Sequence, residues 1–145
     1  ARQLITVSPE RINLNLSVEA DDGAVFPASV GWHPWFAKPT RLVAHPIAMF
    51  EQDDIGLPTG RLIAPTEPPW DDCFLLRSPV ELHYDRRLAP VVTISSPDCE
   101  HWVLYDKPDH ATCVEPQSGP PNALNLRPEL ATSAHPIGRA MSINW

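Results

Sequence analysis

Residues 11–19 show the clearest pattern of hydrophobic and polar positions in the chain. Ile12, Leu14, Leu16 and Val18 alternate with polar residues. Strict alternation is typical of a β-strand with one buried face. Residues 21–23, Asp-Asp-Gly, predict a turn in which the glycine takes a positive φ. Residues 24–26 predict a partner strand, so we expect a hairpin here.

Short segments rich in β-branched or aromatic residues predict further strands at 41–44, 60–64, 80–84, 91–95, 102–105 and 140–145. The chain has 18 prolines in 145 residues, more than twice the usual share of about 5%. Because proline breaks helix interiors, long helices are not expected. Since 43% of the residues are hydrophobic, disorder is not expected either. We therefore predict an all-β fold of antiparallel strands joined by proline-rich loops.

Length and charge limit the classes of function. With 145 residues, the chain has the size of a single domain, residues 1–145. It contains 11 Lys and Arg against 18 Asp and Glu, a net charge of −7, and no run of basic residues. We therefore expect neither nucleic acid nor an anionic membrane as a partner.

Cysteine usage indicates the compartment. Cys73, Cys99 and Cys113 are odd in number, widely spaced and without a Cys-x-x-Cys pair, which argues against a disulfide framework or a zinc site. We interpret them as reduced thiols of a cytoplasmic protein. No apolar stretch approaches the roughly 20 residues of a membrane span, and no signal-peptide pattern is present. The sequence starts at Ala1 without a methionine, so we expect it to begin in mid-protein.

Glu115 stands at the end of a short apolar segment and is followed at once by turn-forming residues. Pro116 restricts Glu115 to an extended conformation, and the Gly-Pro-Pro run at 119–121 disfavours a helix or central strand beyond it. A carboxylate on a stiff backbone suits proton transfer, which needs correct geometry before pKa matters. A surface glutamate at a strand-to-turn junction is the alternative, and these residues alone favour it.

Residues 30–36 gather three aromatic residues and His33 around a glycine and a proline. Such a segment lines a pocket or fills a core, and His33 taken alone fits a buried core histidine as well as a functional one. The acidic pair at 71–72 taken alone fits a solvated turn before a strand. The six histidines show no i, i+4 pair, and we find neither a phosphate-binding loop nor a serine-nucleophile elbow. We therefore predict no metal and no cofactor.

Four segments resemble the aldose 1-epimerases, the galactose mutarotase-like family. Residues 113–123, Cys-Val-Glu-Pro-Gln-Ser-Gly-Pro-Pro-Asn-Ala, resemble the family signature Glu-Pro-Gln-(Ser/Thr)-Gly-Pro-x-(Asp/Asn)-Ala. Residues 27–36 resemble its Pro-x-x-x-Gly-x-His-Pro-Tyr-Phe segment, and residues 70–74 resemble its Asp-Asp-x-Phe segment. Residues 57–60 are similar to a family loop. The four matches follow the family order over residues 27–125.

The resemblance implies an enzyme, an isomerase that interconverts the α and β anomers of a hexose by opening the sugar ring. Glu115 matches the general base at the anomeric hydroxyl, and His33 matches the general acid toward the ring oxygen. Asp71 matches a carboxylate that binds sugar hydroxyls. The chemistry is consistent, because a carboxylate accepts a proton readily and a histidine donates one near neutral pH.

Further side chains near these positions are candidates for holding the sugar. Trp32 and Trp35, with Phe36, would supply apolar faces for a pyranose ring, or else would pack in the core. Gln117 would hydrogen-bond a hydroxyl or brace Glu115. Trp35 stands where many relatives have tyrosine.

The resemblance covers only the second half of a domain that is close to twice this length. The full fold is a large antiparallel β-sandwich, and we expect this chain to form its C-terminal part. Relatives carry a substrate-binding arginine and a further histidine, in an Asn-Gly-x-x-His-Gly-like motif, before the matched region, and neither is present. We therefore expect poor activity alone and, as partners besides the sugar, the missing N-terminal half or a second copy.

Two other functions stay open from the sequence. A non-catalytic carbohydrate-binding β-sandwich, or an inactive epimerase fragment, would use the same aromatic residues without requiring Glu115 and His33 to converge. A glycoside hydrolase would pair Glu115 with Asp71 or Asp72 at a separation set by its stereochemistry. The distance between the side chains of Glu115 and His33 distinguishes the first alternative from catalysis.

Overall fold

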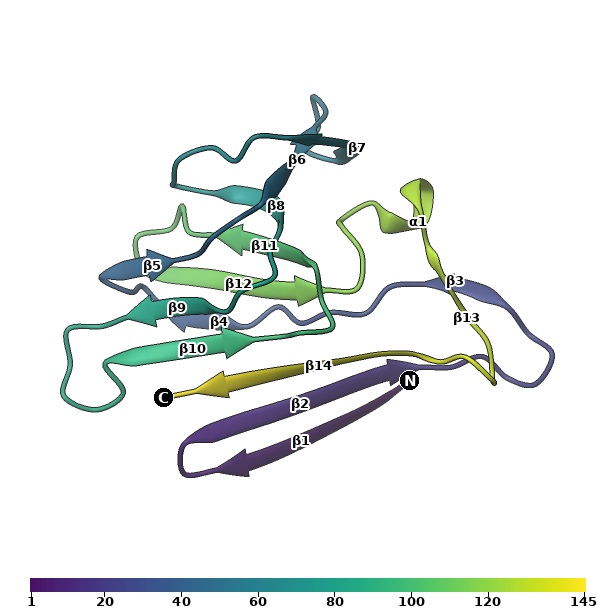
Figure 1. Ribbon diagram of the computed structural model, residues 1–145, viewed down its shortest axis with the longest axis horizontal. Coiled ribbons are helices and arrows are strands. Elements are labelled where there is room, and N and C mark those ends of the chain that lie inside the picture. The colour runs from purple at the N-terminus through teal and green to yellow at the C-terminus, as the bar shows by residue number, and fades with distance from the viewer.

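Two six-stranded antiparallel sheets lie against each other in the computed structural model, which describes residues 1–145 (Figure 1). Sheet 1 contains the two longest strands and has the order β1-β2-β14-β10-β9-β5. Its strands are β1 (Arg2–Ser8), β2 (Arg11–Val18), β14 (Ile137–Asn144), β10 (Val91–Ser95), β9 (Val80–His83) and β5 (Arg41–Val43).

Sheet 2 has the order β4-β12-β11-β8-β6-β7, with β12 next to its edge strand. Its strands are β4 (Trp35–Ala37), β12 (Ala111–Gln117), β11 (His101–Tyr105), β8 (Asp71–Leu75), β6 (Ala48–Gln52) and β7 (Pro58–Ile63). A separate pair is formed by β3 (Phe26–Ala28) and β13 (Glu129–Ala131). The single helix, α1 (Ala123–Leu126), is four residues long. No helix of the structure is long and apolar enough to span a membrane.

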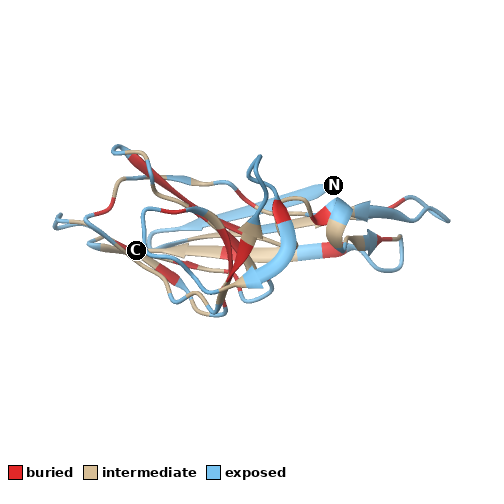
Figure 2. Cartoon of the chain, turned by 90° about the horizontal axis from the view of Figure 1, so that it is seen from above, coloured by how far each residue is buried: buried red, intermediate tan, exposed pale blue.

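The core forms where the two sheets overlap, because each central strand turns its alternate residues inward. In β11, Trp102 and Leu104 are buried while their neighbours are partly exposed. They share one hydrophobic cluster with Val92 and Ile94 of β10 in the facing sheet. The indole nitrogen of Trp102 donates to the carbonyl of Cys99 at 2.9 Å, so this large side chain is buried without an unpaired donor. Figure 2 shows the buried segments inside the molecule and mostly exposed loops around them.

The all-β, antiparallel fold predicted from the sequence is confirmed. Every strand predicted at 41–44, 60–64, 80–84, 91–95, 102–105 and 140–145 is present, with ends that differ by at most three residues. All three cysteines are free and buried. The helix α1 forms just beyond the Gly-Pro-Pro run, where no helix was expected, but it is too short to alter the fold class.

The predicted hairpin between residues 11–19 and 24–26 is wrong. The turn does form, since Gly23 has a φ of 79° and the amide of Ala24 donates to the carbonyl of Asp21. Both edges of β2, however, are already occupied, by β1 on one side and by β14 on the other. The chain after the turn therefore leaves the sheet and pairs with β13 instead.

Removing a fully buried side chain from the core should destabilise the protein strongly. Leu104 has no exposed surface, whereas Leu88 is 85% exposed. We expect Leu104→Ala to lower the free energy of unfolding by about 2–5 kcal/mol. Leu88→Ala, the matched control, should change it by less than about 0.5 kcal/mol. Urea denaturation measures both, and equal effects would contradict the assignment of the core.

Candidate active site

Strand β12 sends its alternate residues to opposite faces of sheet 2. Val114 has no exposed surface and belongs to the core between the sheets. Cys113, Glu115 and Gln117 lie on the other face, because successive strand residues point in opposite directions. Strand β12 lies between β11 on one side and β4 with the segment before it on the other. Glu115 is therefore only 5% exposed. The carboxylate of Glu115 thus belongs to a core strand but lies on the face opposite the core.

The register extends this face across the sheet. Trp35 of β4 lies opposite Cys113, Tyr105 of β11 lies opposite Cys113 on the other side, and Asp71 of β8 lies opposite Tyr105. Residues that pair directly across antiparallel strands share a face. Asp71 is therefore on the same face as Glu115, two strands away.

Pro116 explains how His33 reaches this face. A proline has no amide hydrogen, so at this position β12 has nothing to donate to the segment beside it. That segment contacts β12 through the Gly31 to Gln117 bridge and through the amide of Trp32, which donates to the carbonyl of Pro116 at 3.2 Å. Regular pairing starts again only at β4. His33 lies between these two paired stretches, where the regular hydrogen bonding to β12 is interrupted.

Gly31 fixes how closely the two segments approach. A Cβ atom at position 31 would lie 2.8 Å from Cγ of Gln117, closer than real Cβ contacts. Only glycine therefore lets the backbone that leads to His33 lie directly against β12.

His33 and Glu115 meet at this interruption of the pairing. The Nε2 atom of His33 lies 3.1 Å from Oε1 of Glu115. The Glu115 side chain is 7% exposed and the His33 side chain 60%, so the pair joins a buried base to a solvent-facing ring. Gln117 donates from its amide to Oε2 of Glu115 at 3.4 Å, so both carboxylate oxygens have partners. Part of the site faces solvent as a cavity of about 280 Å³.

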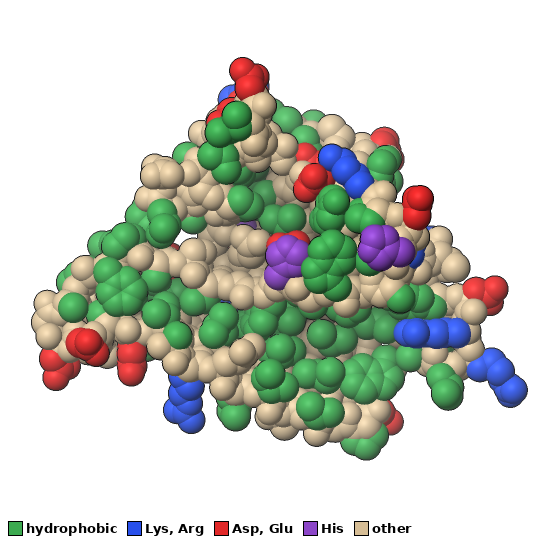
Figure 3. Space-filling view, turned by 180° about the vertical axis from the view of Figure 1, so that it is seen from behind, with side chains coloured by type: hydrophobic (Ala, Val, Ile, Leu, Met, Phe, Trp, Pro, Cys, Tyr) green, Lys and Arg blue, Asp and Glu red, His purple; other side chains and the backbone are tan.

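Two further contacts orient the His33 ring. Its other nitrogen, Nδ1, lies 3.7 Å from Sγ of Cys113. The ring stacks on Trp35 with 5.8 Å between centroids, and Trp35 in turn meets Tyr105 edge to face. Figure 3 shows histidine, acidic and large hydrophobic side chains meeting near the middle of one face, beside a hollow.

Burial raises the pKa of Glu115 above its ordinary value. The positive charge of His33 and the hydrogen bond from Gln117 oppose this rise in pKa, and the negative charge of Asp71 adds to it. Burial also raises the pKa of the Cys113 thiol to about 12, with a further contribution from the charge of Glu115. Cys113 is therefore a neutral thiol beside the His33 ring, and Glu115 is a stronger base than an exposed glutamate.

The structure brings together four of the six residues predicted for the site. Glu115 contacts both His33 and Gln117, and Trp35 stacks on His33. Asp71 is on the same face but pairs with Lys107, its Oδ2 atom 3.4 Å from Nζ. Trp32 borders the cavity, yet it is 8% exposed and belongs to the core cluster.

Sequence reasoning missed Cys113 and Tyr105 as neighbours of the site. The two-residue period of a strand could have identified Cys113, because it places Cys113 on the same face as Glu115. Sequence reasoning also missed that His33, Cys113 and Glu115 bring three potential metal-ligand atoms within 4.8 Å of one another, from positions without ligand spacing.

No protein-family model matches the chain, and no curated protein sequence matches it. Solved structures do match. A candidate aldose 1-epimerase from Escherichia coli K12 is similar over 98% of this chain, with a TM-score of 0.76 and 16% identity. A galactose mutarotase-like protein from Lactobacillus casei ATCC 334 is similar over 97%, with a TM-score of 0.74 and 12% identity.

A galactose mutarotase-like protein from Clostridium acetobutylicum is similar over 93% of this chain, with a TM-score of 0.69 and 16% identity. The chain spans 52–60% of the length of these three structures. Its fold is therefore the galactose mutarotase-like β-sandwich, present in part, as the sequence motifs predicted.

The raised pKa of Glu115 predicts a pH-dependent effect of Glu115→Gln on stability. A carboxyl group whose folded pKa is raised above its ordinary 4.5 loses stability as the pH rises from 4.5 through that folded pKa. Below pH 4.5 the group is protonated in both states and this loss is absent. We therefore expect the melting temperature of Glu115→Gln, relative to the unmodified chain, to increase as the pH rises from 4 to 7.

Differential scanning calorimetry across this pH range measures the effect. The matched control is Glu67→Gln, a substitution at an exposed residue outside the site. Its melting temperature should keep a constant difference from that of the unmodified chain. A relative melting temperature of Glu115→Gln that falls with rising pH would contradict the burial of this carboxylate.

Proposed function

We propose that this chain is the part of an aldose 1-epimerase, or mutarotase, that contains its acid and base and interconverts the α and β anomers of a hexose. The contact of 3.1 Å between His33 Nε2 and Glu115 Oε1 is the observation that supports it most directly. It joins a proton donor and a proton acceptor on a mutarotase-like fold, at the positions that the sequence motif predicted.

The reaction requires two proton transfers, at the two oxygens that are bonded to the anomeric carbon. Glu115 accepts the proton of the anomeric hydroxyl while His33 donates a proton to the ring oxygen. The bond between the anomeric carbon and the ring oxygen breaks and an aldehyde forms. Rotation about the next carbon bond, followed by the reverse transfers, closes the ring on the other face. Since both oxygens are bonded to the same carbon, the two catalytic groups must lie close together, as His33 and Glu115 do.

The surrounding residues suit this chemistry. Burial makes Glu115 a stronger base near neutral pH, and the amide of Gln117 holds its second oxygen. Trp35 is 53% exposed and presents an apolar ring surface beside His33, where a sugar ring would rest. Asp71, on the same face, would accept hydrogen bonds from sugar hydroxyls.

The convergence of Glu115 and His33 argues against the alternatives. A binding module needs aromatic surface and hydrogen-bonding groups, but it does not need a buried carboxylate against a histidine. Glycoside hydrolysis would pair Glu115 with a second carboxyl group about 5 to 9.5 Å away, and it gives no role to the imidazole in contact with Glu115. Ring opening uses the pair as it stands.

The uncovered part of sheet 1 supports a further partner for this chain. Ile5 and Val7 of β1 pair with Leu14 and Ile12 of β2, so they lie on the face that forms the core further along the sheet. They are nevertheless 54% and 67% exposed, because sheet 2 does not extend over β1. We propose that the missing N-terminal half of the sandwich, or a second copy of this chain, covers this surface.

Residues 1–145 alone should self-associate through β1. We expect gel filtration with light scattering to show a mass that rises with concentration, and the double substitution Ile5→Lys, Val7→Lys to reduce this association. Leu4→Lys is the control, since Leu4 is 52% exposed on the opposite face of β1. A concentration-independent monomer would contradict the proposal that a second copy covers this surface.

Catalysis should depend on both members of the pair. The chain alone should show weak or undetectable mutarotase activity, which is restored by adding the N-terminal half of a mutarotase-like protein in cis or in trans. In that active form, Glu115→Gln or His33→Ala should lower the rate of anomer interconversion by about 10²-fold or more. Polarimetry on freshly dissolved α-D-glucose or α-D-galactose measures the rate.

The matched controls are Glu67→Gln and His45→Ala, which change the same residue types at exposed positions outside the site. Both should keep the full rate. If Glu115→Gln and His33→Ala fold normally and also keep the full rate, the pair has no part in the mechanism.

A further inference from the structure

Three different metal-binding groups meet at the candidate active site. One ligand atom each from His33, Cys113 and Glu115 lies within 4.8 Å of the other two, and no second group of three such residues is this close anywhere in the chain. Imidazole, thiolate and carboxylate are the ligands that Zn²⁺ takes in proteins. Proton transfer uses the imidazole and the carboxylate but gives no role to the sulfur, so the set of donors exceeds what the proposed reaction needs.

The distances are close to those of a tetrahedral zinc site. With Zn–N and Zn–O bonds of about 2.0–2.1 Å and a Zn–S bond of about 2.3 Å, tetrahedral ligand atoms lie roughly 3.3–3.6 Å apart. His33 Nε2 lies 3.1 Å from Glu115 Oε1, and His33 Nδ1 lies 3.7 Å from Cys113 Sγ. Because these contacts use opposite nitrogens of one ring, the imidazole must turn until a single nitrogen faces both partners. Shifts of about 1 Å then complete the site.

The segment that contains His33 allows this adjustment. The His33 side chain is 60% exposed, and it lies where the pairing to β12 is interrupted between Gly31 and β4. Segments with few backbone hydrogen bonds open at low free energy. Cys113 and Glu115, in contrast, both belong to β12, which is held between β11 and β4. An ion would therefore meet two fixed ligands when the His33 ring turns outward, and the ring would then close over it as the third.

Charge and space also suit a divalent cation. A coordinating thiol loses its proton, which here passes to solvent. The Cys113 thiolate and the Glu115 carboxylate then carry two negative charges, which neutralise Zn²⁺ within the site. Asp71 adds a further negative charge on the same face. The adjoining cavity of about 280 Å³ provides room for a water molecule as fourth ligand. Three protein ligands and one open position are usual for zinc sites that exchange with solvent.

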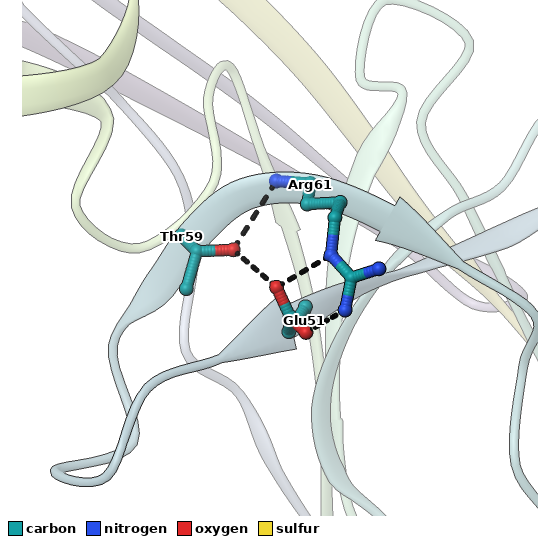
Figure 4. Close-up of polar contacts among 3 residues, drawn as sticks. All are labelled: Glu51, Thr59 and Arg61. Atoms are coloured by element: carbon teal, nitrogen blue, oxygen red, sulfur yellow. Dashed lines mark hydrogen bonds and ion pairs between the residues drawn. The ribbon is translucent and has the colours of Figure 1, made fainter.

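Other acidic side chains compete poorly for such an ion. Glu81 lies 3.0 Å from His83, but no third ligand joins them and the guanidinium of Arg41 lies 3.3 Å from the ring. Glu51 already accepts from Arg61 at 2.7 Å and from a threonine hydroxyl (Figure 4). A positive charge beside each of these carboxylates opposes a cation. The candidate active site has no such charge against its carboxylate other than the His33 ring, which would itself bind the ion.

We propose that His33, Cys113 and Glu115 form a Zn²⁺ site with a water molecule as fourth ligand, and that zinc closes the candidate active site by occupying its acid and its base. Metal binding follows from the geometry alone. Inhibition rests on the proposed function, since a nitrogen and an oxygen bound to zinc cannot exchange protons with a sugar. Mg²⁺ and Ca²⁺ prefer sites made of oxygen ligands and are not expected to bind.

Titration of the unmodified chain with Co²⁺, followed by competition with Zn²⁺, tests the site without relying on catalysis. We expect one equivalent of Co²⁺ to produce a thiolate-to-metal charge-transfer band and the strong visible bands of a tetrahedral ion, and Zn²⁺ to remove both. Isothermal titration should give a Zn²⁺ dissociation constant of about 1 µM, weaker than in structural sites because only three protein ligands bind and a thiol proton is displaced. A large excess of Mg²⁺ should change neither result.

Substitution of the ligands identifies the site. Cys113→Ser should abolish the charge-transfer band and weaken Zn²⁺ binding by about 10²-fold or more, since even changes outside the ligand set cost up to this much. Cys99→Ser, at another buried free cysteine, is the matched control and should keep both. His33→Ala should weaken binding similarly, and it tests the site even if Cys113→Ser does not fold. His83→Ala, which removes the histidine of the two-ligand pair, should leave binding unchanged.

Three results would overturn the proposal. Zinc binding that is unchanged in both Cys113→Ser and His33→Ala would assign the ion to other groups on the surface. Absence of binding at about 100 µM of either Co²⁺ or Zn²⁺, a hundredfold above the expected dissociation constant, would leave no site. Equally tight binding of Mg²⁺ would assign the ion to carboxylates alone.

Inhibition separates this outcome from that of the proposed function. In the active form, Zn²⁺ should stop mutarotation and a chelator should restore it. The zinc concentration for half-inhibition should rise by about tenfold or more in Cys113→Ser, relative to the uninhibited rate of that variant. Metal binding that depends on Cys113, in a protein that never accelerates mutarotation, would leave the metal site and remove the epimerase. Mutarotation that depends on Glu115 and resists Zn²⁺ would leave the epimerase and remove the metal site.

Discussion

The two-residue period of β12 is the constraint on which both the core and the candidate site depend. Val114 is fixed in the interior by packing, and its neighbours Cys113 and Glu115 are thereby fixed on the opposite face. A shift of one residue in the pairing of β12 would expose Val114 and bury the carboxylate in the core, both of which are costly. Hydrophobic packing thus positions a chemical group that it does not touch.

The cost of burying Glu115 is partly offset by its partners. An unpaired buried carboxylate is strongly unfavourable, and here His33 and Gln117 occupy its two oxygens. The net effect is still a raised pKa, so the site retains some of the unfavourable energy of desolvation. Stored energy of this kind is common at proton-transfer sites, where a basic carboxylate is useful.

Local patterns predicted most strands but could not choose their partners. Alternation identified β2, and the turn after it formed, yet pairing was decided by β1 and β14, which come from opposite ends of the chain. Strand β1 was not predicted, because only Ile5 and Val7 alternate with polar residues and the leucine before them interrupts the pattern. Motif matching pointed to His33 and Glu115, which are distant in sequence, whereas only the register brings Cys113 to the histidine ring.

Pro116 has a consequence for motion at the site. The backbone beside it lacks one of the hydrogen bonds that would anchor a regular edge strand, so the stretch that contains His33 is held mainly by Gly31, Trp32 and the start of β4. Local opening free energies are lowest where backbone hydrogen bonds are few. His33 therefore lies in a segment with few backbone hydrogen bonds, while Glu115 lies in a strand that is paired on both sides. Separation of the pair would therefore displace His33 and leave Glu115 in position.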